Sequence, residues 1–174
     1  MSNKRYIGKL ISVKYTDRPS AFYGIVVDFN EEWTLMKLNP CDYCIDGYVI
    51  LRHKNIDRFK RDDMVRFKEK VIMLKGDHLP VVKKFPLSDL QTILSYITKN
   101  YGVFAFYLKS ENSCYLGKLH SFTTNKLTIE YLNPKALWTK KMEFRPGDIR
   151  TIEFDTDYIN SLKLASDNIK AKPL

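Results

Sequence analysis

Hydrophobic and polar residues alternate in short runs along the first third of the chain, and such alternation is typical of β-strands. The runs are rich in Val, Ile, Leu, Tyr and Phe, and short polar segments with Asp, Asn, Pro or Gly separate them. They occupy residues 10–15, 22–29, 33–38, 48–52 and 56–59. Five short strands with polar corners predict a small closed β-barrel, because closure removes the exposed edges of a sheet.

The second of these runs differs from the others because it is apolar on both faces. Tyr23 and Ile25 point to one side of the strand, and Phe22 and Val26 point to the other. Gly24 lies between them, where the missing Cβ permits a strongly bent strand. We therefore expect this strand to contribute to two packing surfaces.

The same pattern recurs in the second half of the chain. Residues 34–40 read Thr-Leu-Met-Lys-Leu-Asn-Pro, and residues 128–134 read Thr-Ile-Glu-Tyr-Leu-Asn-Pro. Gly24 precedes the first segment at nearly the distance at which Gly117 precedes the second. A repeat of this length predicts two copies of one small domain. The strands of the second copy are then expected at residues 103–109, 114–122, 127–132, 142–145 and 149–154.

Helical spacing replaces the strand pattern after each copy. Met64, Phe67, Val71 and Leu74 recur at helical intervals and predict a short amphipathic helix after the first copy. Residues 157–164 predict a short closing helix in the corresponding place after the second copy.

A further helix is expected at residues 88–100, before the second copy. Ser88 is a favourable N-cap, and Gly102 is a stop signal. The apolar stripe of this helix consists of Leu90, Ile93, Leu94, Ile97 and Tyr101. Such a stripe is usually buried, so we expect the helix to pack on the second barrel.

Composition adds that the chain is folded and basic. Of its 174 residues, 44% are hydrophobic and 13% are aromatic, which excludes a disordered or low-complexity chain. The formal net charge of +9 permits RNA or another polyanion as a partner, but acids are mixed with bases throughout, so a charged, soluble surface explains it too. No apolar signal segment or membrane-spanning run is present, and three cysteines do not suggest a disulfide framework. We therefore expect a cytoplasmic protein with no membrane partner.

Candidate catalytic and metal-binding motifs are sparse. Cys41 and Cys44 have half the spacing of a zinc site, but no second Cys-x-x-Cys follows. The other potential ligands are scattered along the chain, at His53, His78, Cys114 and His120. No Ser/His/Asp order, Gly-rich phosphate loop or pair of carboxylates stands out. The sequence therefore predicts no enzyme, no cofactor and no metal.

One corner motif resembles a known family. Residues 51–56 read Leu-Arg-His-Lys-Asn-Ile, and residues 144–149 read Phe-Arg-Pro-Gly-Asp-Ile, each between a predicted fourth and fifth strand. This is similar to the apolar-Arg-Gly-Asp/Asn-Asn-Ile motif of Sm-like small β-barrel proteins, although His53 and Pro146 depart from it. Residues 28–30, Asp-Phe-Asn, resemble the other RNA-contacting loop of that family. The resemblance implies that single-stranded RNA is held by Arg52, Asn55, Arg145, Asp148 and Asn30.

Pattern and resemblance together predict a mainly β protein with short helices, built as two tandem five-stranded Sm-like small β-barrels joined by an amphipathic helix. Residues 1–76 are expected to form the first barrel with its trailing short helix. Residues 77–101 are expected to form the linker and the amphipathic helix, and residues 102–174 the second barrel with a C-terminal short helix.

Two non-catalytic classes of function come first; a metabolic enzyme is a distant third, which a deep polar pocket with convergent titratable groups would support. The first is binding of single-stranded RNA or another nucleic acid through the basic barrel corners, at Arg52 and Arg145. The alternative is a protein-interaction or scaffolding module with no nucleic-acid role, because small barrels also bind peptides and pair strand to strand. Either arginine would also fit a structural role at a strand end, paired with a neighbouring acid. No oligomeric state follows from the sequence.

Overall fold

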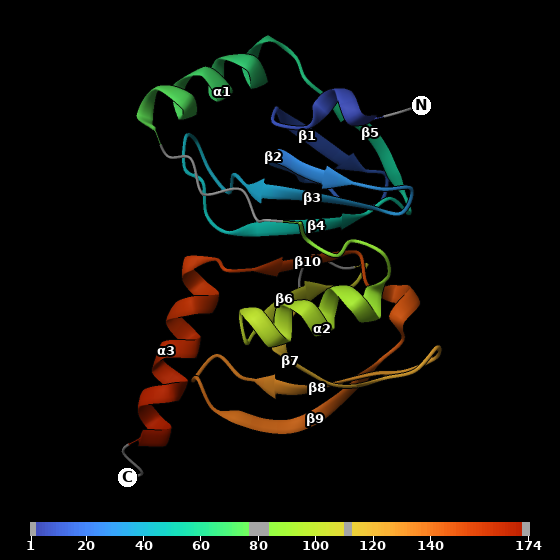
Figure 1. Cartoon of the computed structure of the whole chain (residues 1–174), viewed down its shortest axis with the longest axis vertical. Helices are drawn as coiled ribbons and strands as arrows, with labels where there is room; N and C mark the ends of the chain where they lie inside the picture. The colour runs from blue at the N-terminus through green and yellow to red at the C-terminus, as the bar shows by residue number, and fades with distance from the viewer. Residues whose placement is uncertain (1–2, 77–83, 110–112, 172–174) are drawn as a thin grey trace. The chain divides into compact units, whose positions relative to one another are not determined.

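The computed structural model describes residues 3–76, 84–109 and 113–171. The chain divides into two compact units, Met1–Leu87 and Ser88–Leu174 (Figure 1). The described residues form ten strands in antiparallel ladders and three α-helices, so the protein is mainly β, as the sequence predicted.

The first unit contains five strands and the helix that follows them. These elements are η1 (Asn3–Tyr6, a 3-10 turn), β1 (Leu10–Tyr15), β2 (Ala21–Phe29), β3 (Trp33–Leu38), β4 (Tyr48–Arg52), β5 (Ile56–Lys60) and α1 (Asp63–Lys75). Neighbouring strands are antiparallel in the order β5-β1-β2-β3-β4. Among the described residues β4 does not pair with β5, so hydrogen bonds do not close this sheet into the barrel that the sequence led us to expect.

The second unit has the same arrangement behind an additional helix. Its elements are α2 (Leu90–Asn100), β6 (Phe104–Tyr107), β7 (Cys114–Phe122), β8 (Leu127–Leu132), β9 (Trp138–Phe144), η2 (Pro146–Asp148, a 3-10 turn), β10 (Thr151–Phe154) and α3 (Asp157–Ala171). The strand order β10-β6-β7-β8-β9 matches that of the first unit strand for strand. β9 begins earlier than predicted because Trp138 pairs with Leu132 beyond an irregularity in the ladder. α3 continues past residue 164, and an ion pair of 2.9 Å between Lys163 and Asp167 supports the added turns.

The two units also agree in the register of their first ladders. Ile11 lies opposite Gly24 in the β1–β2 ladder, and Phe104 lies opposite Gly117 in the β6–β7 ladder. A β-bulge then interrupts the β2–β3 and β7–β8 ladders at corresponding positions. The second strand of each unit is therefore placed and bent in the same way.

The two Leu-Asn-Pro segments do not occupy equivalent positions. Gly24 faces Leu38 in the first unit, whereas Gly117 faces Tyr131 in the second. Leu132 is displaced by one position and packs in the cluster below α3, while Leu38 packs in the interior cluster of its unit. Since side chains alternate between the faces of a strand, a shift of one residue moves a side chain to the other face. The alignment that the sequence suggested is therefore wrong by one residue in the third strand.

Gly24 and Gly117 lie where the second strand of each unit approaches the third closely. A Cβ at Gly24 would overlap the carbonyl oxygen of Lys37 and the Cβ of Met36, and one at Gly117 would overlap the carbonyl oxygen of Glu130. A residue without a Cβ is therefore needed at both points, which agrees with the bend that the sequence predicted.

β2 contributes to two packing surfaces, as the sequence predicted. Val26 packs in the interior cluster with Val13 and Met36. Ile25 points to the opposite face and packs with Leu10 and with the buried side of α1. One face of the first unit's sheet thus encloses the interior cluster, because the sheet is curved, and α1 packs on the other face.

α1 is the short helix that the sequence predicted after the first copy, but it does not pack on the sheet through the apolar stripe. Its buried residues are Val65 and Ile72. Met64, Phe67 and Leu74 belong to the predicted apolar stripe, but they are 73%, 53% and 77% exposed. An apolar row, which we define as Met64, Phe67 and Leu74, therefore remains on the surface of α1.

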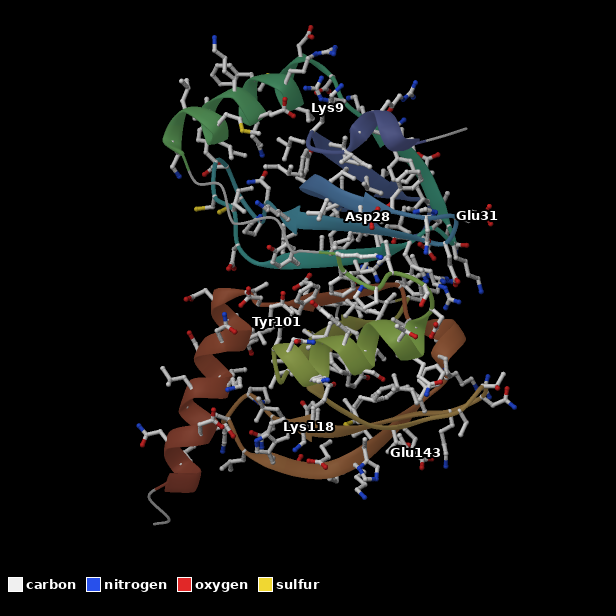
Figure 2. All side chains as sticks on the ribbon, viewed as in Figure 1. Lys9, Asp28, Glu31, Tyr101, Lys118 and Glu143 are labelled. Atoms are coloured by element: carbon white, nitrogen blue, oxygen red, sulfur yellow. The ribbon has the colours of Figure 1, made fainter. Side chains whose placement is uncertain are left out.

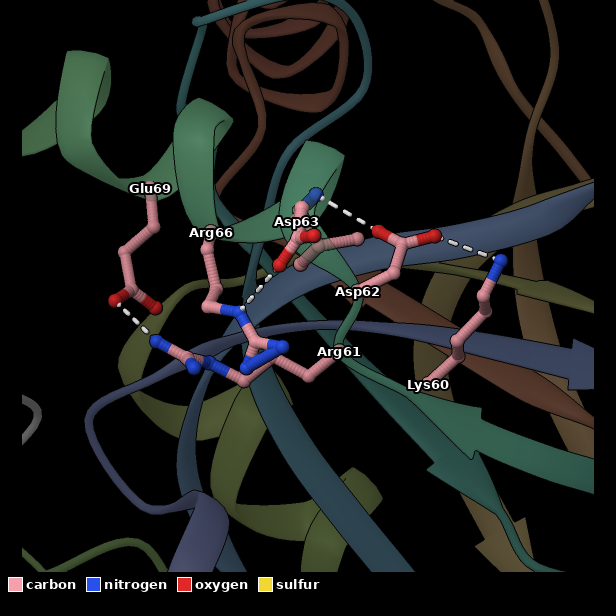
Figure 3. Close-up of polar contacts among 7 residues, drawn as sticks. Lys60, Arg61, Asp62, Asp63, Arg66 and Glu69 are labelled. Carbon is pink, nitrogen blue, oxygen red and sulfur yellow. Dashed lines mark hydrogen bonds and ion pairs between the residues drawn. The ribbon is translucent and has the colours of Figure 1, made fainter.

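A carboxylate on α1 accounts for this orientation. Glu69 accepts a hydrogen bond of 2.5 Å from the backbone N–H of Leu10 and forms an ion pair of 2.7 Å with Arg61 (Figure 3). The Arg61 and Glu69 side chains are only 20% and 18% exposed. Asp62 accepts a hydrogen bond of 2.9 Å from the N–H of Val65 and caps the first turn. These contacts turn Glu69, rather than the apolar row, toward the sheet.

α2 buries the apolar stripe that the sequence predicted, at Leu90, Ile93, Leu94 and Ile97. It packs on β6 and β7, where the Thr98 hydroxyl accepts a hydrogen bond of 3.0 Å from the N–H of Leu119. Its N-cap is Asp89 rather than Ser88: the Asp89 carboxylate accepts from the N–H of Thr92 at 2.9 Å. A carboxylate at this place also interacts favourably with the positive end of the helix dipole.

Candidate nucleic-acid interface

The first predicted corner lies between β4 and β5, and its arginine is engaged within the protein. Arg52 forms an ion pair of 2.5 Å with Glu32, and its guanidinium lies 5.1 Å from the centroid of the Trp33 ring. Its side chain is 20% exposed, and its backbone carbonyl accepts a hydrogen bond of 2.7 Å from the Tyr15 hydroxyl. A phosphate at this corner would have to compete with Glu32 for the guanidinium.

The two asparagines predicted to contact RNA hold loops of the first unit together. Asn30 Oδ1 accepts hydrogen bonds of 2.9 and 2.8 Å from the N–H groups of Glu32 and Trp33. Asn55 adopts a left-handed φ of 68°, and its amide donates to the Asp17 carboxylate at 2.9 Å. Asn30 is therefore next to the ion pair of Arg52, whereas Asn55 contacts the turn between β1 and β2 instead.

His53, which replaces a glycine of the family motif, ties this corner to the β2–β3 hairpin. Its Nδ1 donates to the carbonyl of Glu31 at 2.8 Å, and its Nε2 accepts from the Thr34 hydroxyl at 2.8 Å. Glu31 lies at the tip of the hairpin (Figure 2). Burial lowers the pKa of His53, although the hydrogen bond to Glu31 and the charge of Glu32 oppose the shift. The ring is therefore neutral near pH 7 and has a structural role.

The corner of the second unit is more open. Arg145 and Asp148 are both exposed; Arg145 precedes the 3-10 turn η2, and Asp148 is its last residue. The N–H of Asp148 donates to the carbonyl of Arg145 at 3.0 Å, which closes the turn. The two corners therefore differ: the arginine of the second is exposed to solvent, and that of the first is mostly buried against Trp33 and Glu32.

A groove that the sequence did not single out lies between α1 and the strands β1, β2 and β5. Its volume is about 360 Å³. Four basic side chains line it, namely Lys14, Arg58, Lys60 and Lys68. Three aromatic rings, those of Tyr23, Tyr43 and Phe67, line it as well, and Asp62 is the one acidic residue of the lining that the structure describes. We call this the basic groove.

The cations of the basic groove are only partly neutralised by the protein. Lys60 pairs with the N-cap carboxylate of Asp62 at 2.7 Å, which lowers the pKa of Asp62 (Figure 3). Arg58 is 65% exposed and lies 3.7 Å from the carboxylate of Asp57. Lys14 donates to backbone carbonyls of the β1–β2 turn. Four bases line the groove and Asp62 is the single carboxylate of its described lining, so the lining carries a net positive charge, which favours anions.

The aromatic side chains of the basic groove lie at its surface beside the bases. Lys68 Nζ lies 4.7 Å from the centroid of the Tyr23 ring. Tyr43 and Phe67 make an edge-to-face pair with centroids 6.5 Å apart, and they are 38% and 53% exposed. Large rings that remain partly in water can be covered by a flat ligand, which makes them candidates for stacking.

Sequence reasoning missed this groove because its residues come from separate strands and from α1. Arg58 and Lys60 gave a usable signal, since residues two apart on a strand point to the same face. What the sequence did not give was the place of α1 and the face that it turns toward the strands; helical spacing predicted only that Phe67 lies on an amphipathic helix. The orientation set by Glu69 brings Phe67 and Lys68 to the groove.

The remaining candidate chemistry does not converge on a site. Cys41 and Cys44 are exposed free thiols. Across residues 3–76, 84–109 and 113–171, no group of three or more His, Cys, Asp or Glu is arranged to hold a metal ion. None of the helices in these ranges has both the length and the apolar character needed to cross a bilayer.

Comparison of the chain with protein-family models, curated protein sequences and solved structures finds no match in any of the three.

Proposed function

We propose that the protein is a non-catalytic nucleic-acid-binding module and that its first unit binds single-stranded RNA in the basic groove. The observation that carries this proposal is the lining of one groove by four basic side chains and three aromatic rings. Cations that neutralise backbone phosphates supply affinity for any nucleic acid, and aromatic faces on which bases stack favour single strands. Both kinds of group lie together here on one side of α1.

The arrangement of the groove supports a strand rather than a single small anion. Arg58 and Lys60 lie on β5, and Lys68 lies across the groove on α1. Phe67, next to Lys68 on the helix, and Tyr43 offer ring surface that water now covers in part. Phosphates would contact the basic side chains on β5 and α1, while a nucleobase stacks on the ring of Tyr43 or Phe67.

Resemblance to Sm-like small barrels supports the same class of ligand. The order β5-β1-β2-β3-β4 in the first unit and its bent second strand are compatible with that architecture, and we include the tandem Sm-like assignment in the proposal. The family motif would place RNA at the corners, on Arg52, Asn55, Arg145, Asp148 and Asn30. We favour the basic groove over the first corner because Arg52 is paired with Glu32.

Fluorescence anisotropy with a labelled 12-mer of oligouridine at low salt tests the proposal. The substitutions Arg58→Gln and Lys68→Gln together should weaken binding roughly tenfold or more, since they remove two phosphate contacts. The pair Lys140→Gln and Lys141→Gln is the matched control, because it removes the same charge from exposed positions on β9. The control should change affinity less than twofold.

A third double variant, Arg52→Gln with Arg145→Gln, distinguishes binding in the groove from binding at the corners. If Arg52→Gln with Arg145→Gln abolishes binding and the groove variant does not, RNA binds at the corners. If the wild-type protein does not bind the oligonucleotide, or if equal losses follow every removal of two charges, specific RNA binding is rejected.

A protein partner is the second candidate, and the apolar row on α1 is the observation that favours it. Met64, Phe67 and Leu74 present an exposed hydrophobic face of the kind that amphipathic helices use for docking. A partner recognised in this way would be lost on Leu74→Ser, which lies outside the lining of the basic groove. RNA binding should be unaffected by the same change.

A further inference from the structure

The second unit contains a cavity at the position that corresponds to the basic groove of the first. It has a volume of about 350 Å³ and lies between α3 and the strands β6, β7, β8 and β10. Its volume is at the lower end of the range for small-molecule sites, which is about 300–1,000 Å³. We call it the α3 cavity.

The strand ladders establish the correspondence residue by residue. Glu153 lies opposite Ala105 in the β10–β6 ladder, as Lys60 lies opposite Ser12 in the β5–β1 ladder. All four residues line their respective sites. The position that carries an ammonium group in the basic groove therefore carries a carboxylate in the α3 cavity.

A second pair of positions shows the same loss of positive charge. Tyr107 lies opposite Cys114 in the β6–β7 ladder, as Lys14 lies opposite Ala21 in the β1–β2 ladder. These four residues also line the two sites. A lysine in the first unit is thus matched by a tyrosine in the second.

The chemistry of the α3 cavity follows from these exchanges. Its lining includes three tyrosines, namely Tyr107, Tyr131 and Tyr158, together with aliphatic side chains of the sheet and of α3. Glu153 is the one charged side chain among the described lining residues. Burial raises the pKa of Cys114 to about 11, so its thiol is neutral at physiological pH. Tyr158 is 55% exposed, which places one wall of the cavity at the surface.

An organic cation fits this lining better than the other classes of small ligand. An anion would find a carboxylate and no basic group among the described lining residues. A divalent metal ion needs several charged or histidine ligands at once, whereas the described lining offers one carboxylate, no histidine and a neutral thiol, beside tyrosine hydroxyls that are weak ligands when neutral. A methylated ammonium group is attracted both by a carboxylate and by the faces of aromatic rings, and its methyl groups suit apolar walls.

We propose that the α3 cavity binds a compact organic monocation with a methylated or quaternary ammonium group, held by Glu153 and the three tyrosines. This site is separate from the basic groove and does not depend on RNA binding. The two units would then use equivalent positions for ligands of opposite charge.

Calorimetric titration of the full chain with choline, and with its neutral isostere 3,3-dimethylbutan-1-ol, tests the proposal. Choline should give saturable binding at least about tenfold tighter than the isostere, because the two differ only in charge at the branched centre. Glu153→Gln should remove this preference, since it keeps the shape of the side chain and removes its charge. Tyr158→Leu should weaken choline binding at an exposed position where the fold tolerates the change.

Glu143→Gln is the matched control, because Glu143 lies on β9 (Figure 2). Its side chain is 61% exposed and pairs with Lys126. This variant should leave choline binding unchanged, and so should Arg58→Gln with Lys68→Gln in the basic groove. The proposal is overturned if choline does not saturate, if the isostere binds equally well, or if Glu153→Gln retains the preference. Loss of RNA binding in the groove variant with intact choline binding would show that the two sites are independent.

Discussion

At the scale of single residues, His53 is held neutral between two loops of the first unit. Because burial lowers its pKa in the folded protein, the unfolded chain binds a proton more readily than the folded one. The contribution of His53 to stability is therefore complete above its ordinary pKa of about 6.5 and is lost as the pH falls below that value toward the folded pKa. Urea unfolding at pH 7.5 and 5.5 should show a lower midpoint at pH 5.5.

The variant His53→Gln separates this effect from other titrations. Glutamine cannot gain a proton, so the difference in urea midpoint between the two pH values should shrink. An equal loss in wild type and variant would assign the pH dependence to other groups.

Gly24 and Gly117 make a second prediction at this scale. Gly24→Ala and Gly117→Ala should each destabilise the protein by about 1–3 kcal/mol, because a methyl group would overlap the backbone of the neighbouring strand. Thermal or urea denaturation measures the change. Gly147→Ala is the control: a Cβ there meets no atom within 4 Å, and its effect should be close to zero.

The sequence predicted the bends at Gly24 and Gly117 because a central glycine in a strand with apolar residues on both faces is typical of a bend. It placed the N-cap of α2 at Ser88, one residue before the actual cap at Asp89. Both are favourable cap residues and they are adjacent, so the choice depends on the backbone at the start of the helix, which the residue types do not determine.

At the scale of elements, the attachment of α1 depends on Glu69. Glu69→Ala should destabilise the first unit by about 1–3 kcal/mol, because it leaves the partly buried Arg61 and the N–H of Leu10 without this partner. Hydrogen exchange should accelerate in α1 more than in β2 and β3. Asp63→Asn is the control, since Asp63 is 99% exposed and pairs with Arg66 at the surface. Equal protection of α1 in both variants would contradict the anchoring role.

Periodicity identified α1 as an amphipathic helix, but the face that is buried, at Val65 and Ile72, is not the one marked by the helical spacing of its apolar residues. Met64, Phe67 and Leu74 form a stripe as regular as that of α2, yet they remain exposed because Glu69 bonds to β1. A hydrophobic pattern records only which positions are apolar, so it does not show that the hydrogen bond of Glu69 to β1 outweighs the burial of three apolar side chains. The same limit applies to the third strand of each unit. The two Leu-Asn-Pro segments match in sequence, but their register against the second strand differs by one residue.

At the scale of the whole molecule, the two units have one strand order and different chemistry. The repeat in the sequence predicted ten strands in two groups of five because strand patterns depend on which positions are apolar. The basic groove and the α3 cavity are lined by strand positions on the face of the sheet that is turned toward the following helix. At these positions Lys60 corresponds to Glu153, and Lys14 corresponds to Tyr107. Such positions tolerate any polar residue in a strand pattern, so the pattern carries no information about their function.

We propose that the basic groove of the first unit supplies the contacts to RNA phosphates, and the salt dependence of binding measures those contacts. The logarithm of the binding constant for oligouridine should fall linearly with the logarithm of salt concentration, with a slope of about −0.7 for each phosphate contacted. Arg58→Gln, Lys60→Gln and Lys68→Gln together should reduce the magnitude of that slope by about 2. If the slope stays the same in the triple variant, the basic groove does not contact the phosphates.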